Sequence, residues 1–344
     1  MRVVVCEASV PFIYGGAERH VDRLVAELRG HGCETEKVSV PFKWYPKDEL
    51  LPQCTIWRLL DLSEFNSSTV DLVIATKFPT YFVRHPNKVT WLLHQYRAIY
   101  DLAGTAFSEF THEERDVRLR AKLIDLDTDV LAESRRLFSN SRNTAARLEQ
   151  YNGLTAEPLY HPPPLADRLT AGRYDDYVLS VGRLELTKRV DLVLRALARS
   201  DRALRLVVVG GGSQRGPLQA LAEELGIASR VEFAGEVDDD RLVELYANAL
   251  GVIFAPFDED FGYITLEGFL SRKPVVTTID AGGPLEFVQD GVNGFVVEPA
   301  PDAIASAMGR LAADRALARR FGDCGFERAS TITWRGVVER LVGG

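Results

Sequence analysis

Short apolar runs rich in β-branched residues alternate with longer amphipathic stretches along the whole 344-residue chain. Residues 3–5 are three valines, and residues 204–209 are again almost entirely Leu and Val. Runs of this length are typical of strands that are buried on both faces, and amphipathic stretches between them are typical of helices that cover those faces. The alternation therefore predicts an α/β fold built from doubly wound parallel sheets.

The chain is too long for one hydrophobic core, because single cores stop growing at roughly 250–300 residues. A proline-rich segment, residues 158–164, cannot continue a helix or a central strand, and we interpret it as the connection between two domains. We expect a first domain at 1–165, a second domain at 166–328, and a last helix within 329–344. This helix has no strand of its own to cover, so we expect it to pack back on the first domain.

The expected elements follow the same repeating order in both domains. In the first domain we expect strands at 2–6, 34–40, 71–75, 88–93, 137–141 and 157–160, with helices at 17–29, 110–131 and 143–151. In the second domain we expect strands at 177–181, 204–209, 231–234, 251–255, 274–277 and 294–297, with helices between them and a helical stretch at 301–328. In such sheets the ligand site forms at the carboxyl ends of the strands.

Charge and hydropathy limit the partners that we expect. The formal charge is -8, which argues against a nucleic-acid partner. No run of about 18 apolar residues is present, so we expect a cytoplasmic protein. Residues 1–165 carry a net charge of -2 and the remainder -6, so peripheral contact of the first domain with the inner membrane face is left open. The cysteines at 6, 33, 54 and 324 lack metal-ligand spacing and are interpreted as packing residues.

Paired glycines, Gly15 and Gly16, stand between the first strand and the first helix. Glycine lets the backbone approach a ligand closely, and a helix N-terminus attracts anions. A phosphate therefore fits this loop. The alternative, in which the glycines only permit a tight turn, is left open.

Two cations flank the turn that follows the first strand of the second domain. Arg183 and Lys188 both lie beyond the carboxyl end of this strand, where they can clamp a diphosphate. Fixed cations would also stabilise a diphosphate as its negative charge grows on departure. The alternative is a solvated basic loop.

The next strand ends in a glycine cluster that includes Gly210 and Gly212. Its spacing approaches the dinucleotide fingerprint but has one residue too many before the last glycine, Gly216. The cluster still predicts a nucleotide site of some kind. An NAD-dependent oxidoreductase remains a rival interpretation.

The segment from 256 to 268 places two carboxylates eight positions apart, in a loop and in the helix that follows it. Glu259 can accept hydrogen bonds from the hydroxyls of a polar ligand, and Glu267 can chelate a vicinal diol such as that of ribose. The amides of Tyr263 and Ile264 at the helix start would meet phosphate oxygens. The alternative for Glu267 is an ordinary exposed helix residue.

These segments together resemble the family 4 (GT4) retaining glycosyltransferases. The resemblance rests on residues 182–188, the Glu259–Glu267 pair, residues 281–286, residues 290–294 and the glycine loop at 15–19. It implies a GT-B architecture, with two Rossmann-like domains that face a central cleft. The first domain would bind the acceptor and the second the nucleotide-sugar.

The resemblance also implies a role for each matching residue. Glu259, His94, Arg183 and Lys188 would form the catalytic set, in which His94 orients the donor sugar. The remaining donor-binding residues would be Gly15, Gly16, Gly210, Gly212, Glu236, Val237, Asp260, Phe261, Gly262, Tyr263, Ile264 and Glu267, with the base contacted by backbone around Glu236 and Val237.

The implied activity is transfer of a sugar from an NDP-sugar to a hydroxyl of a glycan, a lipid-linked or a small-molecule acceptor. It would proceed with retention by a front-face path and would need neither a metal nor another cofactor. A catalytically inactive sugar-nucleotide-binding subunit of a synthase is the alternative from another class.

Four residues depart from the family pattern or compete with it. Asp260 and Arg189 stand where the family frequently has glycine, and Asp260 puts the identity of the donor sugar in doubt. Asp125 and Asp127 form a DxD sequence that holds metal in another glycosyltransferase fold. It lies within a predicted helix, so we interpret it as a solvated helix face.

Overall fold

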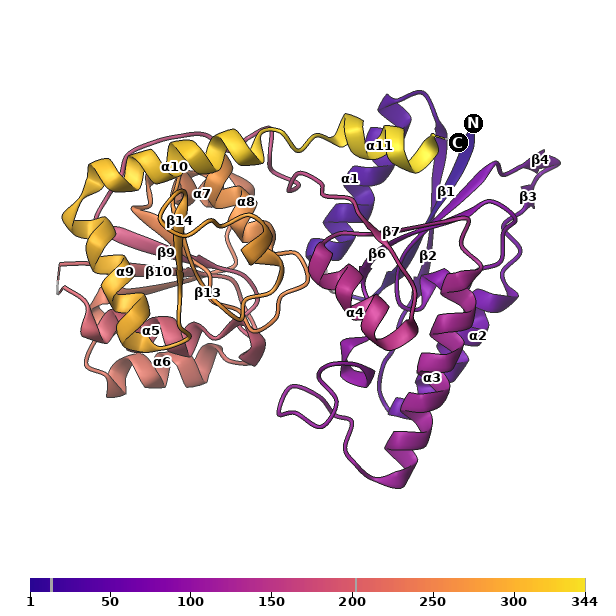
Figure 1. Ribbon diagram of the computed structural model, residues 1–344, viewed down its shortest axis with the longest axis horizontal. Helices are drawn as coiled ribbons and strands as arrows, with labels where there is room; N and C mark the ends of the chain where they lie inside the picture. Colours follow the sequence, from indigo (N-terminus) through magenta and orange to yellow (C-terminus); the bar gives the residue numbers. More distant parts are fainter. Residues whose placement is uncertain (13–14, 202, 344) are drawn as a thin grey trace. The chain divides into compact units, whose positions relative to one another are not determined.

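The computed structural model describes residues 1–12, 15–201 and 203–343, and its contacts divide the chain into two compact units (Figure 1). The first unit contains Met1–Pro164 together with the chain from Thr333 onward, and the second contains Leu165–Ile332. Leu165 therefore belongs to the second unit rather than the first. The second unit also extends past residue 328, because its last helix ends at Ala329 and the chain from Thr333 onward packs with the first unit.

The first unit is built on a six-stranded parallel sheet with the order β2-β1-β5-β6-β7-β8. Val3 and Val5 point into one hydrophobic cluster, while Val4 and Cys6 point into another, as expected for a strand buried on both faces. The strands are β1 (Arg2–Ser9), β2 (Glu34–Pro41), β5 (Leu72–Lys77), β6 (Lys88–His94), β7 (Arg136–Ser139) and β8 (Glu157–Pro158), and a separate hairpin is formed by β3 (Glu64–Phe65) and β4 (Ser68–Thr69).

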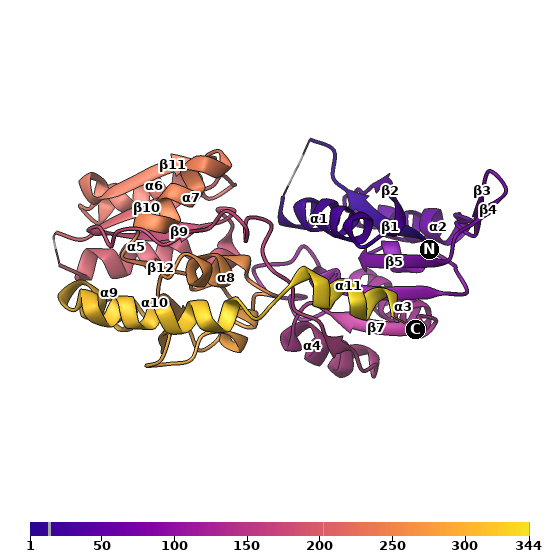
Figure 2. The same ribbon diagram turned by 90° about the horizontal axis from the view of Figure 1, so that it is seen from above.

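Helices cover both faces of this sheet. They are α1 (Gly16–Gly30), α2 (Leu50–Leu59), α3 (Glu114–Ala132), α4 (Arg142–Asn152) and α11 (Trp334–Val342). Helices α1 and α11 pack side by side on the face that contains Val3 and Val5, and α2, α3 and α4 pack on the other face (Figure 2). The last helix buries Trp334, Val337 and Leu341 against this sheet, so it does return to the first unit.

One helix and one hairpin of the first unit were not predicted, and several element boundaries differ, the start of α3 by four residues. Helix α2 contains Pro52, and a proline usually predicts that a helix is interrupted. Here it is tolerated because it lies in the first helical turn. The hairpin β3–β4 has only two residues in each strand. Helix α3 begins at Glu114 rather than at 110, because Thr111 donates both its amide (2.7 Å) and its hydroxyl (3.0 Å) to Asp116 in a turn.

The second unit has a six-stranded parallel sheet with the order β11-β10-β9-β12-β13-β14. Because β9 is central, the chain passes to β10 on one side and to β12 on the other. The strands are β9 (Tyr177–Val181), β10 (Arg205–Val209), β11 (Val231–Gly235), β12 (Gly251–Ile253), β13 (Val275–Thr278) and β14 (Gly294–Val297).

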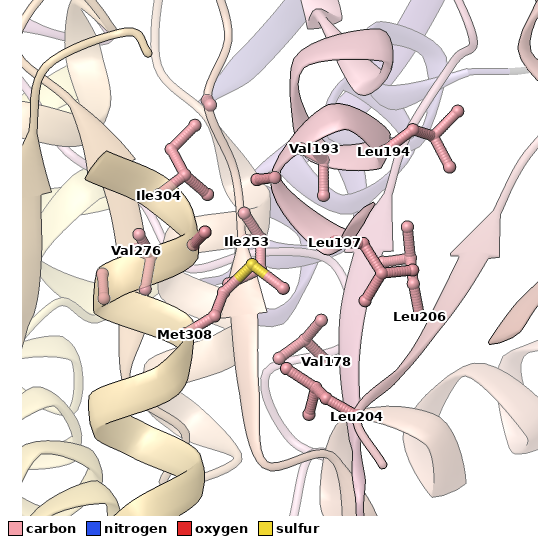
Figure 3. Packing of buried hydrophobic residues seen from close by; sticks show 14 of the residues in the cluster. Val178, Val193, Leu194, Leu197, Leu204, Leu206, Ile253, Val276, Ile304 and Met308 are labelled. Carbon is pink, nitrogen blue, oxygen red and sulfur yellow. The ribbon is translucent and has the colours of Figure 1, made fainter. Parts of the chain in front are cut away.

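One hydrophobic cluster of the second unit lies between this sheet and the helices on one of its faces. Figure 3 shows Leu197 of one helix and Met308 of another near the strand residues Val178 and Ile253. The helices are α5 (Val190–Arg199), α6 (Arg215–Glu224), α7 (Asp239–Asn248), α8 (Tyr263–Leu270), α9 (Pro301–Ala313) and α10 (Arg315–Ala329). No helix in the described part of the chain is long and apolar enough to span a bilayer.

The four cysteines are all free thiols. Cys6 and Cys54 are buried, which confirms their interpretation as packing residues. Cys324 is exposed on α10, so that interpretation is wrong for this position.

Candidate functional site

The candidate site of the second unit lies at the carboxyl ends of β9 and β12. The chain leaves these adjacent strands toward opposite sides of the sheet, which is the arrangement at which doubly wound folds bind ligands. The loop after β9 carries Arg183 and Lys188, and the loop after β12 carries Glu259. The topology therefore brings all three side chains to one edge of one sheet.

Lys188 and Glu259 form a direct ion pair between Nζ and Oε2. Their side chains retain 18% and 23% exposure, and Nζ lies 5.8 Å from the centroid of the Phe254 ring. The sequence predicts separate ligand groups for these two residues, whereas the structure pairs them with each other. A partly exposed pair of this kind contributes little net stability, so both charges can turn to a ligand at small cost.

Arg183 is exposed, and within residues 1–12, 15–201 and 203–343 its side chain has no hydrogen-bond or ion-pair partner. It lies five residues before Lys188, where the chain turns from β9 toward α5. Its guanidinium group is therefore available to an anion in the way that the sequence predicts.

Backbone hydrogen bonds seat the Glu259 loop against the chain that follows β13. The amide of Glu259 donates to Ala281 O at 2.8 Å, and the amide of Gly283 donates to Glu259 O at 2.7 Å. A Cβ atom on Gly283 would lie 2.6 Å from Asp260 O, so this close approach requires glycine. The glycines at 282–283 thus let the following chain pack closely against the backbone of the Glu259 loop.

Glu267 is only 8% exposed, so the alternative of an ordinary exposed helix residue is wrong. Its Oε2 accepts a hydrogen bond of 2.6 Å from the hydroxyl of Tyr246 on α7. Burial and the Glu267 carboxylate raise the pKa of Tyr246 well above its usual value, so the phenol stays a donor. Tyr246 was missed from the sequence, because it lies on a helix whose pattern indicates only packing.

The residues that begin α8 are held by aromatic packing. Gly262 has φ 80°, and a Cβ there would lie 2.9 Å from the Phe254 ring. Phe261 is buried, with its ring centroid 5.5 Å from that of Tyr263. The side chain of Ile264 lies near Gly182, at the end of β9. Because a helix leaves its first amides without intrahelical acceptors, this fixed start suits the phosphate contact predicted for Tyr263 and Ile264.

The glycines at 210 and 212 are required by the protein's own backbone. Gly210 has φ 123°, and a Cβ there would overlap the carbonyl oxygen of Gly182. Gly212 has φ 152°, and its Cβ would collide with the backbone of Leu184. These contacts join the loops after β9 and β10, so the glycine spacing has a reason other than an NAD fingerprint.

Glu236 and Val237 follow β11 on the next strand outward. Glu236 is exposed and Val237 is half-buried. The Oε1 atom of Glu236 is 3.3 Å from the position that a Cβ on Gly211 would take. The loops after β9, β10 and β11 therefore form one continuous edge.

The first unit has its own glutamate–lysine pair where the chain diverges between β1 and β5. Glu18 of α1 accepts the Gly15 amide through Oε2 at 3.0 Å and meets Lys77 Nζ through Oε1 at 3.1 Å. Burial acts to raise the pKa of Glu18, but the Lys77 charge and the Gly15 hydrogen bond outweigh it and lower this pKa. Lys77 was missed from the sequence, although it is the last residue of a buried strand.

His94 ends β6 in register with Lys77 on β5. Its Nδ1 is 3.0 Å from Gln95 O, and the residue is half-buried. Gly15, Gly16 and His94 thus belong to the first unit, whereas the other predicted site residues belong to the second. Residues 13 and 14, which open the predicted glycine loop, lie outside the described residues.

Asp127 is fully buried, so its interpretation as part of a solvated face is wrong. Its Oδ2 accepts hydrogen bonds from Tyr81 (2.8 Å) and Tyr100 (2.6 Å). Asp125 is exposed, as expected. The two side chains point to different surroundings because they lie 200° apart around a helix. The part of the chain that the structure describes contains no cluster of three His, Cys, Asp or Glu residues placed to hold a metal ion.

One family model matches most of the second unit. Residues 168–328 match the family model described as "Glycosyl transferases group 1". The chain is 33% identical over 242 residues to the D-inositol 3-phosphate glycosyltransferase of Nocardia farcinica, covering 63% of this chain and 53% of that protein. It is 32% identical over 257 residues to the protein of that name from Acidothermus cellulolyticus, covering 67% and 57%. The chain thus spans little more than half the length of these relatives.

Solved structures resemble the whole chain at low sequence identity. Sucrose-phosphate synthase from Thermosynechococcus elongatus superposes with a TM-score of 0.78 at 18% identity, covering 99% of this chain and 97% of that one. Anabaena Alr3699/HepE, in a complex with UDP-glucose, gives 0.74 at 17% identity, covering 99% and 98%. The chain therefore has the GT-B fold, and its second unit resembles the glycosyl transferases of group 1.

Proposed function

We propose that this chain is a retaining glycosyltransferase that moves a sugar from an NDP-sugar to a hydroxyl of a glycan, lipid-linked or small-molecule acceptor. The observation that carries the proposal is the arrangement of Arg183, Lys188 and Glu259 at the carboxyl ends of β9 and β12. This is the switch point of the second sheet, where the chain leaves two adjacent strands toward opposite edges. Two cations and one carboxylate are the groups that a diphosphate joined to a sugar requires. The family match of the same segment supports this assignment.

In the proposed reaction Arg183 and Lys188 bind the donor diphosphate and stabilise its charge as the sugar–phosphate bond breaks. Glu259, released from Lys188 when the diphosphate takes its place, accepts hydrogen bonds from the sugar hydroxyls. Glu267 holds the ribose, and the start of α8 holds phosphate oxygens. The acceptor hydroxyl attacks the face from which the diphosphate leaves and gives its proton to a departing phosphate oxygen. This front-face path needs no protein nucleophile and no metal.

The neighbours suggest which substrates to test first. One structural neighbour was solved with UDP-glucose, so UDP-sugars lead the donor panel. The relatives are named for D-inositol 3-phosphate, so phosphorylated polyols lead the acceptor panel.

The test is a thermal-shift screen of the purified chain with UDP-, GDP-, ADP- and dTDP-sugars, followed by a transfer assay with the donor that stabilises most. A specific ligand at about 100 times its Kd stabilises the folded state by about 2.7 kcal/mol. We expect one nucleotide to raise the melting temperature and to support transfer with the anomeric configuration retained.

Two results would contradict the proposal. Stabilisation by reduced nicotinamide cofactor but by no nucleoside diphosphate would favour an oxidoreductase. Donor binding without hydrolysis or transfer to any acceptor would favour an inactive sugar-nucleotide-binding subunit.

A further inference from the structure

Arg189 adopts the left-handed backbone conformation, with φ 48° and ψ 41°, directly before α5. Glycine adopts this conformation without strain, whereas a residue with a side chain does so at a cost of order 1–3 kcal/mol. An arginine at such a position calls for a compensating interaction of its side chain.

The side chain of Arg189 supplies that interaction by binding two other strand-end loops. Its Nε donates to Ala255 O at 2.8 Å, and its Nη2 donates to Pro256 O at 2.6 Å, both at the end of β12. Toward the end of β13, Nη2 donates to Thr278 Oγ1 at 2.9 Å, and Nη1 and Nη2 bind Asp280 in a two-pronged ion pair at 2.8 and 2.7 Å.

The loops joined in this way are the ones that present the ion pair of the candidate site. Lys188 immediately precedes Arg189, and Glu259 lies three residues after Pro256. Backbone bonds continue the connection, because Phe257 N donates to Thr187 O at 2.8 Å and Asp258 N donates to Asp280 O at 2.9 Å. Arg189 thus connects the Lys188 loop to the Glu259 loop through its side chain, in addition to the Lys188–Glu259 ion pair.

Arg189 differs from its neighbour Arg183 in how its donors are used. The guanidinium of Arg189 is engaged by five protein acceptor contacts and is only 17% exposed. Burial acts to raise the pKa of Asp280, but the hydrogen bonds from Arg189 outweigh it and lower this pKa. The guanidinium group of Arg189 therefore binds protein acceptors and is not available to a diphosphate.

We propose that Arg189 is a positioning residue, which with Asp280 fixes the separation of Lys188 and Glu259 for the reaction. This inference rests on the proposed function for its kinetic consequence but not for its structural one. Removal of the side chain should loosen the Glu259 loop while the Arg183 loop stays in place. The chain then still binds a nucleoside diphosphate but holds the sugar poorly in the transition state.

The test compares Arg189→Gly with Arg272→Gly. Arg272 is a matched control, because it also has a left-handed φ (54°) and an ion pair with Asp323 at 2.6 Å. Unlike Arg189, it follows the C-terminal end of α8. Glycine suits both backbones, so each variant loses mainly its side-chain contacts. We would measure kcat, KM for the donor, Kd for the nucleoside diphosphate, and amide hydrogen exchange of residues 255–259 and 278–283.

For Arg189→Gly we expect kcat to fall about 10²-fold, since small misplacements cost that much, with Kd for the diphosphate changed less than about threefold. Exchange in both loops should rise roughly tenfold. Arg272→Gly should leave kcat and these amides unchanged. If Arg189→Gly does not fold, Asp280→Asn is tested instead. We then expect kcat to fall by only about tenfold, because three other acceptors of Arg189 remain.

Unchanged exchange of the two loops in Arg189→Gly, or an equal loss of kcat in Arg272→Gly, would overturn the inference. A wild-type chain that transfers no sugar, while the Arg189→Gly loops still exchange faster, would refute the proposed function and leave the positioning role supported. The two failures are therefore distinguishable.

Discussion

Each unit places a lysine and a glutamate at the switch point of a parallel sheet, but the two pairs differ in exposure. In the first unit the Lys77 and Glu18 side chains are 9% and 10% exposed. In the second unit the Lys188 and Glu259 side chains are 18% and 23% exposed, and Arg183, in the same loop as Lys188, has no partner among the described residues. The same residue types at equivalent points of two sheets thus lie in different environments.

From this difference we expect the first pair to serve structure and the second pair to serve a ligand. A charge that is buried with a single partner leaves an uncompensated charge when that partner is lost. A pair at the surface can exchange its partner for a ligand at small cost. The comparison therefore predicts that substitutions in the second pair abolish activity and that substitutions in the first pair reduce stability.

The largest effect is expected for Lys188→Ala and Glu259→Ala. Each should lower the transfer rate about 10³-fold, since removal of one preorganised electrostatic contact costs 10²–10³ in rate. The measurement is kcat with the donor found by thermal shift. The control is Arg199→Ala, which breaks an ion pair of 2.9 Å with Asp302 in the same unit. Turnover near the wild-type value in either site variant would refute the assigned roles.

A smaller effect, now on stability, is expected for Lys77→Met. Loss of the cation leaves Glu18 charged and buried, so the free energy of unfolding of the first unit should fall by about 3 kcal/mol. Tryptophan fluorescence during urea unfolding reports this unit alone, because all four tryptophans belong to it. Lys188→Met, the matched change in the exposed pair, should cost less than about 1 kcal/mol, measured by far-UV circular dichroism because the second unit contains no tryptophan. Equal losses in the two variants would remove the distinction between the pairs.

Acid should destabilise the first unit more than the second, which contains no histidine. The rings of His20 and His161 are 4.3 Å apart, between Trp91 and Trp334. Burial lowers the pKa of His161 to about 3 and holds the pKa of His20 well below its usual value. Below pH 6.5 the unfolded chain therefore binds more protons, and stability falls toward pH 3 by up to about 1.4 kcal/mol per pH unit for each histidine.

Asp127 acts in the opposite direction. Burial raises the pKa of Asp127 to about 7, so the folded state holds this proton between pH 7 and 3.8 and gains stability as the pH falls. Two histidines outweigh one carboxyl, so the urea midpoint reported by tryptophan fluorescence should decrease from pH 7.5 to pH 5. Asp127→Asn should make the decrease steeper. A midpoint that rises on acidification would contradict this account.

The smallest effect is expected for metal removal. If the cations of the second unit neutralise the leaving diphosphate, EDTA should change the transfer rate by less than about twofold. A loss of activity that Mg²⁺ or Mn²⁺ restores would show that Arg183 and Lys188 do not suffice. The second unit would then need a metal ion to neutralise the leaving diphosphate.

The sequence predicted the second unit better than the first. Its strands are short apolar runs, most of them separated by α-helices, so periodicity located them to within one or two residues. In the first unit α2 was missed because Pro52 hides its start, and the hairpin β3–β4 is too short to leave a pattern. Asp127 was placed on the wrong face because a helix position alone does not say which neighbours cover it.

By itself, the sequence determined the alternation of strands and helices and placed Arg183, Lys188 and Glu259 at strand ends, since parallel strands bring their carboxyl ends to one edge whatever the packing. Only the tertiary structure decided that Lys188 pairs with Glu259, that Tyr246 supports Glu267, and that Arg189 joins two further loops. These contacts link residues 21 to 91 positions apart. Their formation depends on strand register and side-chain packing, and neither quantity is encoded in local sequence spacing.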